Sequence, residues 1–587
     1  MLTVSSNTVD SKNIKKEQSS TDIEDGEQIA LNSIEPEPTT RWGRFRNSFK
    51  PAILDEYEHD ETFNDLEKAI AATAQSPLHK SLKNRHLQMI AIGGAIGTGL
   101  FIGSGGALAS GGPAALIIGW FLTGIMVYST VQALGELAVR FPISGGFNVY
   151  STRFIDPSWG FAMGWNYALQ WLIVLPLELV AASITIGFWN DTINKAAWVA
   201  IFYSIIVFIN LFGVKGYGEA EFFFSTVKVL AVIGFIILGI ILDCGGGPKG
   251  GYIGGRYWSN PGAFSNGFKG VCSIFVTAAF SFSGTELVGL GACETKNPRK
   301  SLPRATKQVF WRITLFYIIS LTLVGLLVPY DDSRLGASSN ASASPFVLAI
   351  ENAGISGLPS VINVVIIIAV LSVANSSVYG CSRTLTALAV QGMAPKQFAY
   401  VDRAGRPLVS VVVSLVFGLL CFLAASSKEG EVFDWLLSLS GLSSVFTWGS
   451  VCFCHIRFRY AMKVQGRDAN AELAFMAQSG TIGSYFGVLL NTLTLVAQFY
   501  VALFPIGGEP NASDFFQSYL AFPVIFAFYA FHKIWKRNWI LYVRAKDIDL
   551  DTGSAEHDLD LLIQEIQEEK DFIASKPIWY RAYRFWC

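Results

Sequence analysis

Long apolar segments alternate with short polar connections along most of the chain. A membrane-spanning helix needs about 20 predominantly apolar residues, and twelve segments come close to that requirement or meet it. They cover residues 88–110, 113–138, 160–188, 196–213, 222–243, 271–291, 309–329, 359–387, 409–427, 433–456, 483–506 and 515–533. We therefore predict an all-α polytopic membrane protein with twelve transmembrane helices. Helices 1, 6, 8 and 10 are expected to be the least regular, because glycine or charged residues interrupt them.

Polar sequence flanks the apolar part on both sides. Residues 1–85 are predicted to form a disordered cytosolic tail, residues 86–533 the twelve-helix domain, and residues 534–587 a second cytosolic tail. The second tail contains the segment "DLDLLIQEIQEEKDF" (558–572). Its leucine and isoleucine residues recur on one helical face, which predicts a short amphipathic helix. No short apolar core precedes a small-residue cleavage site near the N-terminus, so the first span is expected to act as its own anchor.

The distribution of Lys and Arg predicts the orientation, because these residues accumulate in cytosolic connections. Residues 294–312, 402–407 and 455–467 are rich in them, whereas 110–113 and 505–514 contain none. The first group is therefore expected to face the cytosol. With an even number of helices, both termini then lie in the cytosol.

Three asparagine sequons fall in the predicted outer connections, at Asn190, Asn340 and Asn511. Asn340 is the preferred glycosylation candidate because its loop is the longest. The alternative for each is an unused loop asparagine. Asn375 also begins a sequon, but it lies inside helix 8 and should be out of reach of a glycosyltransferase.

The composition agrees with a membrane protein and excludes other classes. Hydrophobic residues make up 51% of the chain, charged residues 15%, and the net charge is −1, which gives no electrostatic basis for binding nucleic acid. The eight cysteines include no CxxC pair, so they indicate no zinc site. Cys244 and Cys272 either form a bridge outside the membrane or remain free thiols. No His cluster, Ser/His/Asp set or metal-ligand pattern is apparent at membrane depth, so we expect neither an enzyme nor a cofactor.

Glycine is concentrated in the first span, "IAIGGAIGTGLFIGSGG" (90–106), although each glycine costs roughly 1 kcal/mol relative to alanine inside a helix. Helix 6 has a similar interruption, "TAAFSFSGTELVGLG" (277–291), with glycine and polar residues at its middle. Helix 6 comes five helices after helix 1, so a second group of five helices would start from the opposite side. Interrupted helices in corresponding positions of two opposed halves point to a transporter with a five-plus-five inverted repeat.

The glycines of the first span have an alternative explanation as a helix-packing seam. Such a seam repeats a small residue at every fourth position, and Gly93 and Gly97 fit this spacing. The next position in the series is Phe101, however, and Gly99 lies off the stripe. A broken helix explains the pattern better. Its freed N–H groups attract an anion and its freed carbonyls attract a cation, so two breaks suit a zwitterion.

Several motifs carry a family resemblance. They are "KNRHLQMIAIGGAIGTGLFIGSG", "GELAVRFPISGGF", "GVKGYGEAEF", "FSFSGTELVGL", "NPRKSLPRA", "SLSGLSSVFTWGS" and "CHIRFR". The chain resembles the fungal amino acid permeases of the amino acid–polyamine–organocation superfamily, above all the general amino acid permeases. The resemblance runs from about residue 80 to the final "RFWC". It implies twelve helices, a five-plus-five repeat, and broad proton-driven import of L-amino acids across the plasma membrane by alternating access. The proton gradient is then the driving force. The alternative is an amino acid receptor on the same fold that transports little or nothing.

The resemblance also implies where the substrate binds. The backbone amides at the helix 1 break would receive the substrate carboxylate, with the Thr98 hydroxyl as an extra donor: Gly97, Thr98 and Gly99. The carbonyls at the helix 6 break would receive the ammonium group: Ala279, Phe280 and Phe282. Phe280 occupies the family's aromatic gate and also offers a cation–π face. The alternative for Phe280 is an ordinary lipid-facing or core aromatic.

Three of the ionisable residues inside the predicted spans are candidates for function, because charge at membrane depth is costly and marks function by default. Glu286 in helix 6 and Lys228 in helix 5 are the candidates for proton coupling, by analogy with proton-coupled relatives. Glu286 could instead be a structural carboxylate bonded to neighbouring backbone, and Lys228 a lysine that extends to the cytosolic surface. Glu178 in helix 3 falls on the substrate-facing side by rough alignment.

Three polar residues of helix 8 lie at membrane depth: Ser372, Asn375 and Ser377. They either line the substrate pocket or bond to helix backbone.

The tails carry candidates for regulation that rest on the resemblance. Lys12, Lys15 and Lys16 are candidate ubiquitin acceptors for endocytosis, or simply solvated charges. "DIDLD" (547–551) resembles an export signal, and Cys587 is a candidate palmitoylation site. The expected partners are the amino acid substrate, membrane lipid, a ubiquitin ligase and the export machinery. Transit through the endoplasmic reticulum and endosomes follows from these partners.

Overall fold

The computed structural model of the chain describes most of the residues between 40 and 554 and a few beyond. The described residues are 40–52, 68, 78, 82, 84–94, 96–143, 145–189, 192–291, 294–295, 298–335, 344–425, 429–554, 567–568, 571–573, 575–578 and 580. The chain divides into two units, residues 1–51 and 52–587. The first contains the short helix α2 (Arg41–Asn47), which begins at Thr40, whose hydroxyl accepts a hydrogen bond from the Gly43 amide.

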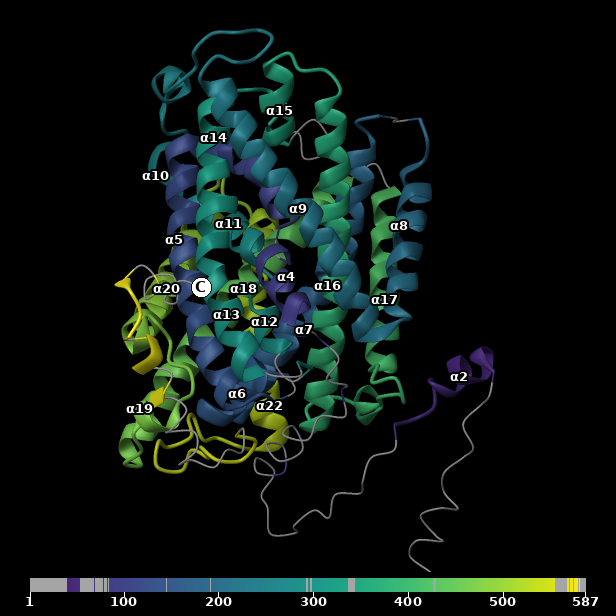
Figure 1. Cartoon of the computed structure of the whole chain (residues 1–587), viewed down its shortest axis with the longest axis vertical. Coiled ribbons are helices and arrows are strands. Elements are labelled where there is room, and N and C mark those ends of the chain that lie inside the picture. The colour runs from purple at the N-terminus through teal and green to yellow at the C-terminus, as the bar shows by residue number, and fades with distance from the viewer. Residues whose placement is uncertain are drawn as a thin grey trace, which may run out of the picture. The chain divides into compact units, whose positions relative to one another are not determined.

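The second unit is built of helices (Figure 1). The helices of its first half are α4 (Asn84–Gly93), the π-helix η1 (Gly99–Gly103), α5 (Ser104–Arg140), α6 (Phe147–Phe154), α7 (Pro157–Ile186), α8 (Lys195–Asn210) and α9 (Gly213–Asp243). Next come η2 (Trp258–Gly262), α10 (Gly267–Ser273), α11 (Phe275–Phe282), α12 (Leu287–Leu290), α13 (Pro298–Arg312), η3 (Ile313–Ile319) and α14 (Ser320–Leu327). The remainder are α15 (Pro345–Asn352), α16 (Leu358–Val390), η5 (Lys396–Ala399), α17 (Leu408–Gly418), η6 (Leu419–Ala425), α18 (Glu429–Val464), α19 (Ala469–Glu472), α20 (Gly480–Leu503), α21 (Ala512–Tyr519) and α22 (Ala521–Lys536).

These helices account for the twelve predicted spans. Within the described residues, eight helices are long and apolar enough to cross a membrane, and the bent pair α21 and α22 makes a ninth. Two further apolar helices are shorter, Lys195–Asn210 and Leu408–Leu423. The long helix from Gly99 to Arg140 is interrupted at Gly112, where φ is 81° and ψ is 171°. It therefore contains the second half of helix 1 and all of helix 2.

The expectation that helices 8 and 10 are irregular was wrong. α16 runs for 33 residues and α18 for 36 residues without a break. The departures from α-helix fall instead in helix 7, which contains the π-helix η3, and in helix 9, which ends in the 3₁₀ helix η6. Glycine and serine within α16 and α18 are tolerated because packing against neighbouring helices outweighs their weak helix propensity.

Helices 1 and 6 run antiparallel to each other. At one end, the Leu82 amide donates to the Glu294 carbonyl at 3.1 Å, so the start of helix 1 meets the end of helix 6. At the other end, the Ser265 amide donates to the Gly111 carbonyl at 2.9 Å, where helix 1 ends and helix 6 is about to begin. This is the relation expected for equivalent helices of an inverted repeat.

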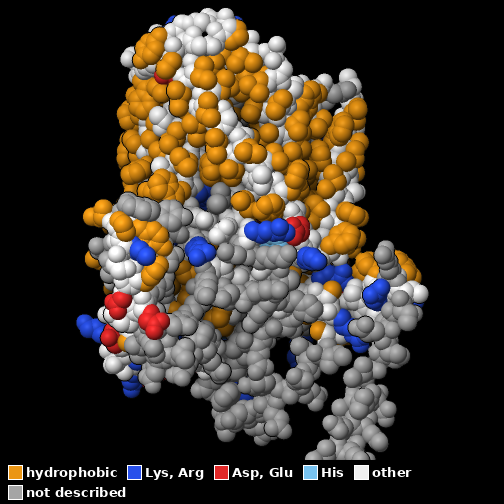
Figure 2. Space-filling model, in the orientation of Figure 1, with side chains coloured by type: hydrophobic (Ala, Val, Ile, Leu, Met, Phe, Trp, Pro, Cys, Tyr) orange, Lys and Arg blue, Asp and Glu red, His pale blue; other side chains and the backbone are white. Residues whose placement is uncertain are grey.

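The helices bury several charged residues in the core and expose many large apolar side chains. Along α9, Phe223, Leu230 and Ile237 follow each other at intervals of seven and are 60%, 65% and 56% exposed, while Glu221 and Lys228 are fully buried. Figure 2 shows hydrophobic side chains covering the flank of the helices, with Lys and Arg gathered toward its lower part. Apolar flanks, with the charged groups of these helices turned inward, suit a bilayer, because lipid offers no partner for a charged group.

The segment that follows α22 packs against the helices. Val543 donates its amide to the Ile155 carbonyl at 2.8 Å, and Ile548 and Leu550 are buried. The "DIDLD" sequence therefore lies in a packed segment. Asp549 shows the effect on charge. Burial raises its pKa, but the Thr552 hydrogen bonds, the Asp551 amide and the nearby Arg153 charge outweigh burial, so the pKa lies below its ordinary value.

The structure answers one of the alternatives left open in the connections and describes part of another. Cys244 and Cys272 are both free thiols, the first exposed and the second buried. Asn511 begins α21, and its side-chain oxygen accepts from the Ser513 and Asp514 amides at 2.6 and 3.2 Å. Asn375 is fully buried in α16, which agrees with its predicted inaccessibility. Asn190 and Asn340 lie outside the described residues.

Candidate functional site

Helix 1 is broken after Gly93, where α4 ends, and resumes at Gly99, where η1 begins. The first N–H groups of a helix have no partner in a preceding turn. Gly97, Thr98 and Gly99 lie at that point, and Thr98 is fully buried. Burial keeps water away from these amides, so a ligand that supplies acceptors would satisfy them.

Helix 6 is broken between α11 and α12. Ser283 leaves the helix with ψ 138°, and Gly284 follows with φ 95°. That φ lies in the region that favours glycine, so a side chain at Gly284 would strain the backbone. Glu286 immediately precedes α12, and its Oε1 accepts from the Gly284 amide at 3.2 Å.

The two breaks meet at Gly99. A Cβ atom added there would lie 2.5 Å from the Ser281 Cα and 2.8 Å from the Ser281 amide nitrogen. These are backbone atoms, which cannot move aside as the end of a flexible side chain can. Glycine is therefore required at residue 99 for the close approach of helix 1 to helix 6.

A small cavity of about 10 Å³, the room that one water molecule needs, lies between the two breaks. Its lining includes five residues that the sequence predicted: Gly97, Thr98, Gly99, Glu178 and Phe280. The Thr98 hydroxyl donates to Glu178 Oε2 at 2.5 Å. Oε1 of the same carboxylate is buried and has no hydrogen-bond partner among the described residues. An unpartnered buried carboxylate oxygen at a cavity is a natural acceptor for a cationic ligand group.

Four lining residues were missed by the sequence analysis: Trp171, Val174, Ser283 and Val373. Trp171 and Val174 lie seven and four residues before Glu178 on α7, so helical periodicity from Glu178 could have found both. Ser283 is the first residue of the helix 6 break. Val373 has no sequence signal, because an aliphatic residue of a long apolar helix is not distinguishable from its neighbours.

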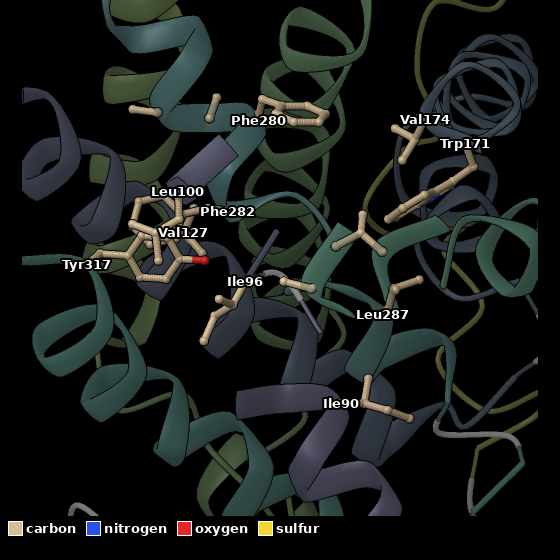
Figure 3. Packing of buried hydrophobic residues seen from close by; sticks show 14 of the residues in the cluster. Ile90, Ile96, Leu100, Val127, Trp171, Val174, Phe280, Phe282, Leu287 and Tyr317 are labelled. Atoms are coloured by element: carbon tan, nitrogen blue, oxygen red, sulfur yellow. The ribbon is translucent and has the colours of Figure 1, made fainter. Parts of the chain in front are cut away.

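Phe280 and Phe282 have different surroundings (Figure 3). Phe280 lines the cavity together with Trp171 and Val174. Phe282 packs against Tyr317, with ring centroids 4.2 Å apart, and does not line the cavity. The Phe282 carbonyl accepts from the Thr285 hydroxyl at 2.5 Å, and the Phe280 carbonyl accepts from the Ser283 amide at 3.0 Å. Ala279 is buried in α11 but is not part of the cavity lining.

Lys228 does not extend to the cytosolic surface, so that alternative was wrong. It is fully buried, and its Nζ donates to the Gly93 carbonyl at 2.5 Å and to Ser372 Oγ at 2.7 Å. Gly93 is the last residue of α4, where carbonyl groups lack helical partners. The lysine therefore places its positive charge at the C-terminal, negative end of α4, the first half of helix 1.

Glu286 is also buried, and three donors surround its carboxylate. The Tyr167 hydroxyl and the Gly284 amide donate to Oε1 at 3.1 and 3.2 Å, and Trp448 Nε1 donates to Oε2 at 3.1 Å. Glu286 thus places its carboxylate at the N-terminal end of α12. It bonds neighbouring backbone, as the structural alternative requires, and it also connects helices 3, 6 and 10.

The three polar residues of helix 8 lie away from the cavity. Ser372 donates to Glu221 Oε2 at 2.6 Å and accepts from Lys228. Asn375 accepts from Asn210 at 3.0 Å. Ser377 donates to the Ala374 carbonyl of its own helix at 2.7 Å, which is the backbone-bonding alternative.

Some predicted residues fall outside the described part of the chain: Lys12, Lys15, Lys16, Asn340 and Cys587. The amphipathic segment 558–572 is also largely outside it. Across the part that the structure describes, no group of three or more His, Cys, Asp or Glu side chains could hold a metal ion.

Two larger hollows lie beside the segment that follows α22. One, of about 780 Å³, is lined by residues such as Arg457 and Tyr542, and the other, of about 740 Å³, by residues such as Gln391 and Lys536. Neither is lined by a helix break. The small cavity is therefore the candidate site, because only a break supplies unpaired backbone groups for a ligand.

Antiparallel broken helices that meet at a buried cavity define a multi-pass membrane transport protein rather than an enzyme. Comparison with known proteins gives the family. The family model described as "Amino acid permease" matches residues 86–545, so the chain belongs to the amino acid permease family. It is 62% identical to the general amino-acid permease GAP2 of Candida albicans, over 94% of each chain.

Other relatives extend this result. The general amino-acid permease GAP1 of Saccharomyces cerevisiae is 61% identical, over 93% of this chain and 92% of its own. The histidine permease of the same yeast is 53% identical, over 87% and 86%. These relatives are all described as permeases, which gives no support to the receptor alternative.

Proposed function

We propose that this chain is a proton-coupled symporter of the plasma membrane that imports L-amino acids of several kinds by alternating access. The observation that carries the proposal is the distribution of charge over the four half-helix ends. Lys228 occupies the C-terminal end of α4, and Glu286 occupies the N-terminal end of α12. The other two ends are those at Gly99 and Phe282, and Gly99 and Phe280 line the cavity. Among the described residues, no charged side chain is hydrogen-bonded to the backbone groups of these two ends.

A free amino acid complements these two remaining ends. Its carboxylate suits the amides of Gly97, Thr98 and Gly99, because anions bind at helix N-termini. Its ammonium group suits Glu178 Oε1, which lies at the cavity without a hydrogen-bond partner among the described residues. Of the three carbonyls predicted to help, those of Ala279, Phe280 and Phe282, only that of Phe280 belongs to a residue that lines the cavity. A compound that lacks either group would leave one end uncompensated.

Proton coupling is assigned to Lys228 and Glu286. Both are buried ionisable groups placed directly at a helix break, so a change in the charge of either changes the electrostatics of the break that it stabilises. Uptake should therefore be favoured by acid outside. The proton gradient would be the driving force, with no cofactor.

The tails and connections complete the proposal. Both termini face the cytosol, where Lys12, Lys15 and Lys16 serve a ubiquitin ligase and Cys587 carries a lipid. Asn340 would carry the glycan outside. These assignments rest on the family resemblance and on the positive connections of the sequence.

Uptake of one labelled amino acid, with many unlabelled competitors, tests the proposal in cells that lack their own permeases. We expect free L-amino acids of several side-chain types to compete, and methyl esters and simple amines to fail. A protonophore should abolish accumulation. Uptake that needs sodium and persists without a proton gradient would contradict the coupling, and competition by esters would contradict the assignment of the breaks.

A further inference from the structure

The interface between α9 and α16 contains a group of polar side chains that the site described above does not explain. Glu221, Ser225 and Lys228 of α9 and Ser372 of α16 are all fully buried. Glu221 and Lys228 are seven residues apart, two turns on one face of the helix. Glu221 is not part of the cavity lining. Its burial therefore calls for a role other than substrate contact.

Hydrogen bonds connect Lys228 to Glu221 in one direction. Lys228 Nζ donates to Ser372 Oγ at 2.7 Å, and Ser372 Oγ donates to Glu221 Oε2 at 2.6 Å. The direct approach of Nζ to Glu221 Oε1 is longer, at 3.5 Å. The serine hydroxyl can therefore accept a proton from the lysine while giving its own to the carboxylate.

The same lysine reaches the helix 1 break. Its Nζ donates to the Gly93 carbonyl at 2.5 Å. Loss of a proton from Nζ removes the positive charge from the C-terminal end of α4. Proton transfer at this interface is thus linked to the backbone that borders the substrate cavity.

Polar and aromatic groups continue from Glu221 along the same interface. The Tyr217 hydroxyl lies 3.2 Å from Ser376 Oγ, and the Tyr217 and Tyr379 rings stack with centroids 4.3 Å apart. Arg383 lies over the Tyr379 ring at 4.2 Å and binds Glu294 at 2.8 Å. The Glu294 carbonyl accepts from the Leu82 amide, just before helix 1. This series of polar and aromatic side chains therefore ends where the chain enters the membrane.

We propose that Glu221 is the proton acceptor of Lys228, with Ser372 as the bridge, and that the proton leaves from Glu221 toward the end of the interface that holds Glu294. This inference rests on the proposed proton coupling and adds its route. In the first step an N–H bond of the lysine breaks, the Ser372 proton moves to Glu221 Oε2, and the lysine proton replaces it. A cation and an anion become a neutral amine and a neutral acid, so one proton has moved from Lys228 to Glu221 while the total charge of the pair stays zero. In the second step the Glu221 O–H bond breaks and the proton passes to water.

Other ionisable groups face this pair from the elements packed around it. They are Glu178 of α7, Arg312 of α13, His86 of α4, Tyr217 of α9, and Tyr379 and Arg383 of α16. Of these, Glu178 lies at the cavity, so it stands on the side from which a proton would reload Lys228.

Purified full-length protein in liposomes tests the route, with an imposed proton gradient in one assay and counterflow exchange without a gradient in another. Glu221→Gln keeps the shape of the side chain but cannot take up and release a proton. We expect gradient-driven accumulation to fall about a hundredfold, the effect of losing a proton-transfer group. Its pH dependence should be lost, while exchange falls by less than about threefold, because exchange needs no net proton movement.

Two further variants separate the route from a structural role. Ser372→Ala keeps both charges and removes the bridge, so accumulation should slow while exchange remains. Glu219→Gln is the matched control: it lies two residues away on α9, is 44% exposed and pairs with Arg85, and should behave as the wild type.

The outcomes are distinct. Normal, pH-dependent accumulation by Glu221→Gln would overturn the route. Equal loss of exchange and accumulation by a Glu221→Gln protein that is fully folded, judged by its thermal unfolding midpoint, would also overturn it and make Glu221 structural. The wild type in the same liposomes tests the proposed function separately, since amino acid uptake without proton dependence would contradict the symport whatever the variants do.

Discussion

The breaks in helices 1 and 6 are stabilised by charges of opposite sign that come from different places. At helix 1 the charge is Lys228, which reaches Gly93 from another helix. At helix 6 the charge is Glu286, which belongs to the broken helix itself and bonds Gly284 two residues away. The helix 1 break therefore depends on the packing of α9 against α4, whereas the helix 6 break is stabilised partly within its own segment.

This difference teaches which break is more sensitive to a change elsewhere in the molecule. Lys228 donates to the Gly93 carbonyl and the Ser372 hydroxyl, and the Glu221 carboxylate lies nearby. Removal of the lysine therefore leaves the buried Glu221 carboxylate without a compensating charge. Within the described part of the chain, the donors bonded to the Glu286 carboxylate are neutral, and the charge of the buried Arg312 is close enough to interact with it. A glutamine side chain at residue 286 would be neutral and could still accept part of these hydrogen bonds through its amide oxygen. We therefore expect charge removal at helix 1 to have the larger effect.

The largest effect is expected for Lys228→Met, because breaking a buried ion pair by removing one partner costs about 3–5 kcal/mol. Uptake should be abolished and the thermal unfolding midpoint should fall. Lys215→Met, on an exposed part of the same helix, is the control and should do neither. The double variant Lys228→Met/Glu221→Gln removes both charges and should recover much of the lost stability. A stable, fully active Lys228→Met protein would mean that the helix 1 break does not depend on the lysine.

The next effect is expected for Gly99→Ala, where the added Cβ would meet Ser281 backbone at 2.5 Å. The breaks would be forced apart, and a shift of about 1 Å at a reacting centre can cost about a hundredfold in rate. The uptake rate and the surface level of the protein should be measured together. Gly106→Ala is the control, since nothing lies within 4 Å of its added Cβ. Equal uptake by the two variants would show that the close approach is not required.

A smaller effect is expected for Glu286→Gln, which fixes the side chain in a neutral state. Substrate binding should persist and lose its pH dependence, and exchange should survive. Concentrative uptake should fall about tenfold or more, the size of effect expected from weakening one hydrogen bond to a charged group, which contributes about 1.5–3 kcal/mol. Binding, uptake and surface expression are measured together. A variant that is retained in the cell and binds nothing would make Glu286 structural. Full, pH-dependent accumulation at a normal surface level would remove it from the coupling.

The smallest effect is expected for Ser377→Ala. Its hydroxyl bonds back to the Ala374 carbonyl and does not line the cavity, so the loss is one backbone-directed hydrogen bond, worth about 0.5–1.5 kcal/mol. The Michaelis constant should stay within about twofold of the wild type for every amino acid tested. A change that depends on the substrate side chain would place Ser377 at the pocket.

The sequence located the breaks because glycine and polar residues are conspicuous in an apolar span. Gly97, Thr98, Gly99, Glu178 and Phe280 were predicted at the site and line the cavity. The sequence did not show that Phe280 lines the cavity and Phe282 does not, because two aromatic residues two positions apart differ only in the direction of their side chains. Tyr317, far along the chain, occupies the space beside Phe282.

The role of α9 shows a different limit. Counting apolar residues placed the start of helix 5 at residue 222, because Lys215, Glu219 and Glu221 precede that point. The helix starts at Gly213, so Lys228 is in the middle and not near an end. Glu221 was excluded from the span by its charge. Its distance of seven residues from Lys228 is the signal that could have placed both on one buried face.

The sequence by itself determined that the chain crosses a membrane many times and that helices 1 and 6 are interrupted, since both follow from local composition: apolar length, and glycine where the helix must end. Tertiary structure alone decided which charges occupy the interruptions. Lys228 and Gly93 are 135 residues apart, and Trp448 and Glu286 are 162 residues apart. No local pattern encodes such pairs, because their energy depends on removing both partners from water at one point in the folded protein.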